Sequence, residues 1–387
     1  MAIDPGQYEG RAQALVKHTF LSKYLPALVG KLGNSRDRLV YIDGFAGPWK
    51  SSDEENFSDT SFGIALDAML AAQQFQKNRG HNVKMTAHLV EKDPAAFQKL
   101  DGFAKQFDTI NVTPREGDFH GHMQAILNSL QPSDFCFTFI DPKGLSLDIK
   151  ALSPLLARRS SEVLINFMYD FFNRLAGMDS EAITEIMNAL MLGAEWRPKL
   201  EAARNPKERE EVIIEAFCEC VRTSGNYKYV TTLKVQKPSH DRTLYHLVFG
   251  TRHPAGLEVF RDSQIKALET QAQVRSTAKT KAKSKKSGMD DMFGGSDTVA
   301  LDPSAREIEA GKIDGVKFAR ALIASRSNGI LWPEIWPAVL EKHTIRKSVL
   351  GNSLNELRKA GSIIAPDWPS ERQSQPRDGQ KFLSIEP

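Results

Sequence analysis

Apolar residues along the first two-thirds of the chain follow two alternating spacings. Short runs rich in apolar residues predict strands at residues 38–42, 83–90, 109–113, 135–140 and 163–168. Apolar residues three or four positions apart predict helices between them, at residues 10–32, 60–78, 94–107, 119–130 and 148–157. Strands of this kind that alternate with helices are typical of a parallel sheet covered by helices on both faces.

The pattern changes beyond residue 168. Helices are predicted at residues 181–191 and 206–223, and strands follow at residues 227–235 and 243–249. Pro238, Ser239 and Asp241 lie between the two strands and indicate a hairpin. An antiparallel hairpin that closes an otherwise parallel sheet is how Rossmann-type methyltransferase sheets end, so we predict an α/β fold of that type for residues 1–270.

Composition shifts at residue 271. Lysine and arginine alternate with serine, threonine and alanine, and a Gly-rich acidic stretch follows at residues 288–297. Such a segment buries too little apolar surface to order itself, so we expect a flexible linker at residues 271–304. Its basic half is either a solvated spacer or a contact for nucleic acid.

We expect residues 305–387 to form a second, smaller domain. Helices are predicted at residues 316–325, 331–341 and 345–359, and short strands at residues 363–364 and 382–385. Three helices and a short hairpin predict a winged-helix-like α+β domain. Its third helix, with polar residues Arg346, Lys347, Asn352, Asn355 and Arg358, would then enter a DNA major groove. The same scaffold also serves as a protein-binding module.

The composition excludes several classes of protein. A chain of 387 residues is too long for one core, and a net charge of +3 does not by itself indicate a partner. Three cysteines argue against a disulfide scaffold and fit a reducing cytoplasm. No run approaches the apolar length of a membrane helix, and no secretory signal is visible, so we expect a cytoplasmic protein that does not bind membranes.

No metal site is expected either. Cys218 and Cys220 lack a second cysteine pair, which makes a zinc site improbable by spacing. His120 and His122 are two positions apart on a predicted helix and therefore do not face each other.

Candidate chemistry lies where the predicted strands end. Asp43, Gly44, Phe45, Ala46 and Gly47 follow the first strand, and glycines there let the backbone turn and approach a ligand. The segment is not the G-x-G-x-x-G dinucleotide fingerprint, and an ordinary tight turn is the alternative.

Two further acidic residues follow the next strands. Glu91 ends the second strand, where a carboxylate can accept hydrogen bonds from ribose hydroxyls. Asp118 follows the third strand and suits an adenine amino group, with Phe119 against the ring, although Asp118 also suits the N-cap of the next helix.

The fourth strand leads into Asp141, Pro142 and Lys143. The carboxyl end of a central strand, next to the topological switch point, is where open α/β sheets place their chemistry. These three residues are therefore the strongest catalytic candidates, with Asp141 facing the ligand.

The ordered set of strand-end residues resembles class I S-adenosylmethionine-dependent methyltransferases over about residues 10–266. More closely, the chain resembles the three-Cys-motif partner protein family. That resemblance is carried by Lys17-His18-Thr19-Phe20-Leu21, by Ile42-Asp43-Gly44-Phe45-Ala46-Gly47-Pro48, and by Leu247-Val248-Phe249-Gly250-Thr251-Arg252-His253-Pro254. The first two segments are also similar to a bacterial ribosomal RNA adenine-N6 methyltransferase.

The resemblance implies S-adenosylmethionine as cofactor and a nucleic-acid amino group as target. It places the cofactor against Lys17, His18, the turn of residues 43–47, Glu91, Asp118 and Phe119. Lys17 and His18 would form part of a lid, or else lie exposed on the first helix. The resemblance also implies a three-Cys-motif protein as partner.

One departure concerns the loop after the fourth strand. Amino-methyltransferases of this kind carry Asp or Asn, then Pro-Pro and an aromatic that stacks on the flipped base. Here Lys143 replaces the second proline and Gly144 replaces the aromatic. Tyr169 or Phe171 is the substitute for stacking, or else part of the core.

Three functions fit these observations. The first is a methyltransferase that acts on RNA or DNA. The second is a catalytically silent methyltransferase-like scaffold that binds a partner protein or DNA, which the change at Lys143 and Gly144 favours. The third is a DNA-binding regulator that works through the winged helix.

Overall fold

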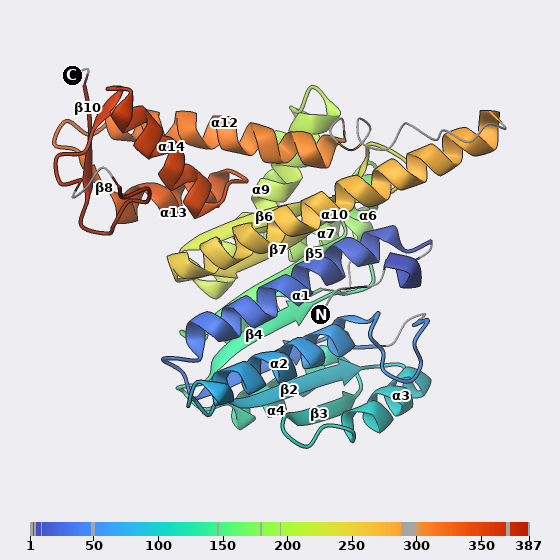
Figure 1. Cartoon of the computed structure of the whole chain (residues 1–387). Coiled ribbons are helices and arrows are strands. Elements are labelled where there is room, and N and C mark those ends of the chain that lie inside the picture. Colours follow the sequence, from blue (N-terminus) through green and yellow to red (C-terminus); the bar gives the residue numbers. More distant parts are fainter. Residues whose placement is uncertain are drawn as a thin grey trace. The chain divides into compact units, whose positions relative to one another are not determined.

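The structure is a computed structural model, and it describes residues 3, 5–8, 10–47, 51–144, 147–178, 180–193, 195–287, 299, 302–368 and 372–385. It has two compact units, Met1–Gly256 and Leu257–Pro387 (Figure 1). In the described part of the chain, none of the helices combines the length and the apolar character needed to cross a membrane.

The first unit is built on a seven-stranded sheet with the order β3-β2-β1-β4-β5-β7-β6. The strands are β1 (Arg38–Asp43), β2 (Lys84–Glu91), β3 (Asn111–Glu116), β4 (Phe135–Ile140), β5 (Ser161–Phe167), β6 (Tyr229–Gln236) and β7 (Thr243–Thr251). The first five are parallel, while β7 pairs antiparallel with both β5 and β6. This mixed sheet with its terminal hairpin confirms the α/β prediction and is consistent with a Rossmann-like methyltransferase fold.

The sheet has its switch point between β1 and β4. The chain adds β2 and β3 on one side of β1 and then crosses to place β4 on the other side. Loops that leave the carboxyl ends of β1 and β4 therefore diverge, which opens a crevice at this edge in open α/β sheets.

Helices cover both faces of the sheet. On one face α1 (Ala12–Leu32) packs against α2 (Ser61–Asn78), and Phe62 of α2 contacts Phe103 of α3 (Pro94–Ala104) with ring centroids 5.7 Å apart. The other face carries α4 (Phe119–Ser129), α5 (Ile149–Leu156) and α9 (Pro206–Gly225). Shorter helices are η1 (Pro5–Tyr8), α6 (Tyr169–Leu175), α7 (Glu181–Leu190) and α8 (Trp196–Glu201).

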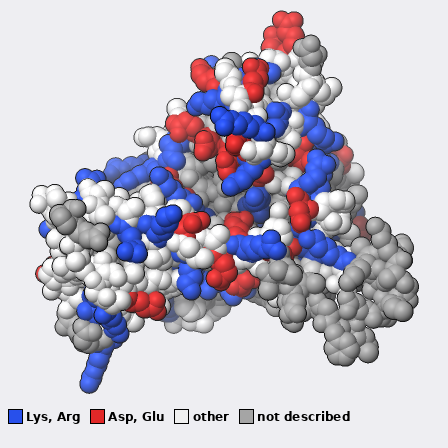
Figure 2. All heavy atoms as spheres, turned by 90° about the horizontal axis from the view of Figure 1, so that it is seen from above, with Lys and Arg blue, Asp and Glu red and all other residues white. Residues whose placement is uncertain are grey.

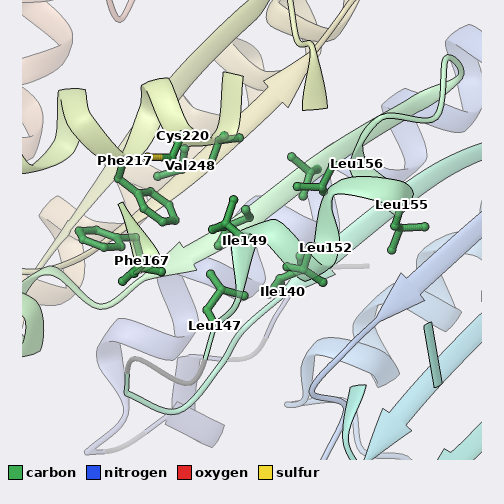
Figure 3. Packing of buried hydrophobic residues seen from close by; sticks show 14 of the residues in the cluster. Ile140, Leu147, Ile149, Leu152, Leu155, Leu156, Phe167, Phe217, Cys220 and Val248 are labelled. Atoms are coloured by element: carbon green, nitrogen blue, oxygen red, sulfur yellow. The ribbon is translucent and has the colours of Figure 1, made fainter. Parts of the chain in front are cut away.

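One cluster of buried hydrophobic residues lies under α4, α5 and α9. Figure 3 shows Ile149 and Leu152 of α5 and Phe217 of α9 pointing toward strand residues such as Phe167 and Val248. Strand side chains alternate between the two faces, so Val40 and Ile42 join this cluster. Tyr41 and Asp43 consequently point to the opposite face, which α1 covers. The side chain of Asp43, the last residue of β1, therefore lies on the α1 side of the sheet.

The second unit combines long helices with a small antiparallel sheet. Its elements are α10 (Pro254–Ser287), α12 (Pro303–Ala324), β8 (Ile330–Leu331), α13 (Trp332–Lys342), α14 (Lys347–Lys359), β9 (Ile363–Ile364) and β10 (Lys381–Ser384). The strand order is β8-β10-β9, with antiparallel pairing throughout. Ile335, Leu340, Leu350, Leu354 and Phe382 are buried and form part of its core.

The predicted linker needs correction. Residues 271–287 are helical and belong to α10, and the contacts divide the chain at Gly256 rather than at residue 270. A buried ion pair joins this part of α10 to the start of α12: Arg275 Nε lies 2.9 Å from Asp302 Oδ2, and each side chain is only 1% exposed. Gln271 also donates to Ser304 Oγ at 2.8 Å, so the two ends of the expected linker are bonded together. Residues 288–298 of that linker lie outside the described part.

The helix α12 begins earlier than predicted. The sequence placed its start at residue 316, but it begins at Pro303, with Asp302 accepting a hydrogen bond from the Ser304 N–H. Asp followed by Pro is a regular helix start, and the weak apolar spacing of residues 303–315 concealed it. The short helices α6 and α8 were also not predicted, because one or two turns give no readable period.

A buried carboxyl group lies at the amino end of β5. Glu162 is enclosed by α1 and β7, where Tyr24 donates to Oε2 at 2.5 Å and Thr251 donates to Oε1 at 2.7 Å. Burial raises the pKa of Glu162 from 4.5 to about 7, although both hydrogen bonds favour the charged form. The carboxyl group therefore titrates near neutral pH.

This titration predicts how stability depends on pH. With the folded pKa above the unfolded value, the stability contributed by the protonated group is complete below 4.5 and is lost as the pH rises to about 7. Glu162→Gln cannot lose this contribution. The difference in free energy of unfolding between the variant and the wild type should therefore shift by about 2–3 kcal/mol in favour of the variant as the pH rises from about 5 to about 8. Urea denaturation at several pH values measures this difference, and a constant difference would contradict the assignment.

Candidate functional site

Polar side chains gather where β1, β2, β4 and β5 end. Asp43 and Glu91 are the last residues of β1 and β2, Asp141 follows β4 directly, and Asn166 is the penultimate residue of β5. These strands are parallel, so their carboxyl ends meet at one edge of the sheet. The edge includes the switch point between β1 and β4, where the sequence predicted the chemistry.

Asp141 lies at the centre of this edge and is held from two sides. Its Oδ2 forms an ion pair with Lys17 Nζ of α1, and its Oδ1 accepts a hydrogen bond from Asn166 Nδ2 at 2.5 Å. The Lys17 and Asp141 side chains are 14% and 20% exposed. A carboxylate accepts about four hydrogen bonds, so Asp141 keeps capacity for a ligand.

Lys17 and His18 are neighbours in α1 but face different surroundings. Lys17 reaches Asp141, with its ammonium 5.8 Å from the centre of the Phe139 ring. His18 is buried, and its Nδ1 lies 2.9 Å from Tyr8 Oη. Burial and the charge of Lys17 hold the pKa of His18 well below its usual value, so the ring is neutral. The structure thus brings Lys17 to Asp141, whereas His18 anchors the segment before α1.

Asp43 organises the turn that follows β1. Its side chain is fully buried and accepts hydrogen bonds from the Phe45 N–H at 3.0 Å, Tyr41 Oη at 3.1 Å and Ser61 Oγ at 3.2 Å. Burial raises the pKa of Asp43 to about 6, and the charge of Asp141 adds to that effect. Three internal donors make Asp43 the support of the turn.

Gly44 allows a close approach between this turn and α4. A Cβ atom at Gly44 would lie 2.7 Å from Cδ1 of Phe119, which is inside the contact distance of two carbon atoms. Phe119 is buried, and its ring centroid lies 6.1 Å from that of Phe45. The ring that the sequence assigned to the adenine therefore packs beneath the glycine turn. Ala46 N–H donates to the Val90 carbonyl at 2.8 Å and ties the turn to β2.

Glu91 is the buried carboxylate at the end of β2. Its Oε1 accepts a hydrogen bond from the Asp93 N–H at 2.7 Å. Burial raises the pKa of Glu91, while that hydrogen bond and the nearby charge of Lys143 act in the opposite direction. The electrostatic influence of Lys143 on Glu91 shows that the loop after β4 reaches toward the end of β2.

Asp118 caps α4, as the sequence allowed. Its Oδ1 accepts from the His120 N–H at 2.9 Å, and the side chain is 63% exposed. The N-cap role leaves the carboxylate accessible to a ligand. His122 contacts the Glu116 carbonyl at 2.7 Å. Within the described residues, no group of three or more His, Cys, Asp or Glu side chains is placed to hold a metal ion.

The two candidate stacking residues differ in exposure. Tyr169 is buried, and its ring makes an edge contact with His246 at a centroid distance of 6.0 Å. Phe171 is half-buried, and Cε1 of its ring lies 3.5 Å from where a Cβ of Gly144 would be. Phe171 thus lies beside the loop of Asp141, at the position where the sequence lacks an aromatic.

The loop between β1 and α2 is anchored to the N-terminal segment. Asp59 is buried and accepts hydrogen bonds from the Ser52 N–H at 2.8 Å and from Ser51, and it forms an ion pair with Arg11. Burial opposes its ionisation, but the hydrogen bonds from Ser51, Ser52 and Arg11 lower the pKa of Asp59 to about 2. Pro48, which the resemblance includes, lies outside the described residues.

Sequence reasoning missed four residues that support the site. Asn166, Tyr41, Ser61 and Asp59 hold the predicted carboxylates or their loops. Asn166 left a readable signal, because it is a lone amide in the otherwise apolar run of residues 163–167 within β5. A buried amide requires partners, which points to a polar neighbour at the strand end.

Comparison with known proteins adds little to this picture. No protein family and no curated protein matches the sequence. Among solved structures, a DUF519-family protein from Legionella pneumophila str. Philadelphia 1 has a TM-score of 0.38 at 11% identity, over 68% of this chain and 92% of that one. Loganic acid methyltransferase with SAH has a TM-score of 0.30 at 10% identity, over 80% and 92%. At such scores, the assignment of fold depends on the strand order itself.

The contact beneath the glycine turn can be tested by a single substitution. Gly44→Ala places a methyl group against the Phe119 ring and should lower the free energy of unfolding by about 1–3 kcal/mol. Adding Phe119→Leu should recover part of the loss by making room. Gly30→Ala is the matched control: this glycine lies in α1 with nothing near its Cβ, and alanine there should stabilise by about 0.5–1 kcal/mol. Equal unfolding curves for Gly44→Ala and the wild type would contradict the contact.

Proposed function

We propose that the chain is an S-adenosylmethionine-dependent methyltransferase that acts on an amino group of a nucleic acid. The observation that carries the proposal is Asp141, a partly exposed carboxylate held by Lys17 and Asn166 at the switch point of the sheet. Open α/β sheets bind their ligands at that point. The three residues come from α1, β5 and the loop after β4, so the whole unit positions the group.

The residues around Asp141 fit the proposed cofactor. Glu91 uses Oε1 for the Asp93 N–H and has capacity left to accept from ribose hydroxyls. The turn at Gly44 presents backbone where a larger residue would meet Phe119. Asp118 presents an accessible carboxylate on the adenine side. These contacts would bind the nucleoside and the amino-acid portion at one strand edge.

The chemistry is a transfer of one carbon to nitrogen. S-adenosylmethionine, when bound, supplies a methyl group on a positively charged sulfur, which leaves as neutral S-adenosylhomocysteine. Asp141 would accept a hydrogen bond from the acceptor amine and orient its lone pair. The amine loses one proton as the nitrogen–carbon bond forms, and that proton passes to solvent water. Alignment of the two reactants supplies most of the rate enhancement in such a site. Lys17 and Asn166 would hold Asp141 in place, and Lys143 would contribute a positive charge near Glu91.

The second unit supports a binding role. After α10, its order of one helix, a short strand, two helices and two strands is typical of winged-helix domains. The polar residues that we expected in a DNA groove contact their own unit instead: Asn352 lies 2.5 Å from Gln375, Asn355 donates to the Gln373 carbonyl, and Arg358 lies over Trp368. Arg346 and Lys347 lie 3.7 Å and 3.9 Å from Glu269 and Glu258.

These internal contacts favour a second candidate function. With the polar side of α14 engaged, the winged-helix-like domain suits a protein partner better than a DNA groove, and the exposed Ile364 and Ile385 fit that role. The chain would then be a methyltransferase-like scaffold for a partner such as a three-Cys-motif protein. An assay of methyl transfer distinguishes the methyltransferase from the scaffold.

Cofactor binding is tested by calorimetric titration of the full chain with S-adenosylmethionine. Glu91→Gln removes the carboxylate proposed for the ribose and should weaken binding about tenfold or more. Glu219→Gln is the matched control, because Glu219 is an exposed residue of α9 whose side chain pairs with Arg222. The absence of binding to the wild type, or equal binding by both variants, would contradict the proposed site.

Catalysis is tested by transfer of labelled methyl groups to RNA and DNA. Asp141→Asn should keep S-adenosylmethionine binding but lower the rate by about 100-fold or more, because the amide accepts hydrogen bonds less strongly than the carboxylate. Cofactor binding without transfer to either polymer would favour the scaffold. Undiminished transfer by Asp141→Asn would remove Asp141 from the mechanism.

A further inference from the structure

The hairpin between β6 and β7 reaches the edge of the sheet that carries Asp141. The register pairs Phe167 at the end of β5 with His246 of β7, so the start of β7 lies beside the end of β5. Residues 237–242 therefore project from the same edge as Asp141, and α6 begins there at Tyr169. Two segments far apart in the sequence thus flank the proposed site.

A cluster of cations connects these two segments. Asp170 of α6 lies 3.0 Å from Lys237 Nζ, 3.4 Å from an Arg242 nitrogen and 3.8 Å from Arg174 Nε. The Asp170 side chain is largely buried, whereas those of Arg174 and Arg242 are both 64% exposed. One carboxylate thus positions three cations, and the two guanidinium groups keep most of their donors facing solvent.

The cations around Asp170 form a local concentration of positive charge. On the described part of the face in Figure 2, lysine and arginine are interspersed with aspartate and glutamate. Even when Asp241 of the hairpin is included, the cations around Asp170 outnumber the carboxylates. A polyanion would therefore be attracted to such a cluster rather than to a whole basic face.

A half-buried aromatic ring adjoins the cluster. The Arg174 guanidinium lies 5.7 Å from the centre of the Phe171 ring. The same ring borders Gly144, whose missing side chain leaves that side of the ring open to the loop of Asp141. Phe171 thus takes the place of the aromatic that the loop after β4 lacks.

We propose that α6 and the β6–β7 hairpin bind the acceptor strand, a single-stranded nucleic acid. Arg174, Arg242 and Lys237 contact its phosphates, and the target base stacks on Phe171 next to Asp141. Bases stack on aromatic rings only when they are outside a duplex, and arginines bind phosphate through paired donors. The inference builds on the proposed function, since it assigns the substrate site of that reaction.

Fluorescence anisotropy of the full chain with labelled single-stranded RNA and DNA tests the proposal. The double variant Arg174→Gln, Arg242→Gln should bind about tenfold or more weakly, with the slope of log affinity against log salt reduced by about 1–1.5. Phe171→Leu should weaken binding about tenfold with an unchanged salt slope, because stacking is lost and charge is kept. Lysine at both arginine positions should restore the salt slope.

The chain offers a matched control. Arg79 lies 5.4 Å from the ring centre of the exposed Phe75 in the last part of α2, at the opposite end of the sheet. Phe75→Leu and Arg79→Gln repeat the chemistry of the test variants away from the site, and each should change binding by less than about twofold. Thermal melting of all variants checks that they fold.

Titration with S-adenosylmethionine keeps the two proposals apart. Test variants that bind the cofactor normally but lose nucleic acid support the inference. Two results overturn the inference and leave the cofactor site standing, provided that the cofactor binds. In one, the test variants bind both nucleic acids as well as the wild type does; in the other, the wild type binds neither nucleic acid. If the wild type binds no S-adenosylmethionine and the test variants lose nucleic-acid binding, the nucleic-acid surface of α6 and the β6–β7 hairpin is supported and the proposed function is overturned.

Discussion

The site depends on the cost of removing carboxylates from water. Asp43, Glu91 and Asp141 each end or follow a buried strand, and each is compensated by nearby donors. The donors come from different parts of the chain: Lys17 from α1, and Asn166 from β5. Satisfying these groups therefore fixes α1 and the strand-end loops to the sheet edge, so the acidic residues organise the unit as well as its site.

The sheet and the acidic residues of the site could be predicted from the sequence because both follow from local pattern. A run of apolar residues followed by Asp43, Glu91 or Asp141 is visible without knowledge of the fold. Their partners could not be predicted in the same way. Lys17 meets Asp141 across 124 positions of sequence, a pairing that only the packing of α1 decides.

Local pattern also misled where it was ambiguous. Lysine and alanine are good helix formers and are equally common in disordered linkers, so residues 271–287 could be assigned either way. In the structure they are helical, and Arg275 among them pairs with Asp302, which is 27 positions away. Phe119 shows a related limit, because an aromatic residue after a strand end could contact a ligand or support a loop. In the structure its ring packs against Gly44 and supports the turn after β1.

The buried Arg275–Asp302 pair also determines how the protein can be dissected. A second unit cut at residue 305, as composition suggests, loses both members of this pair, together with all of α10 and the first residues of α12. It also loses Arg261, which donates to the Leu340 carbonyl at 2.6 Å. An excised second unit must therefore include α10. The natural point of excision lies near Gly256.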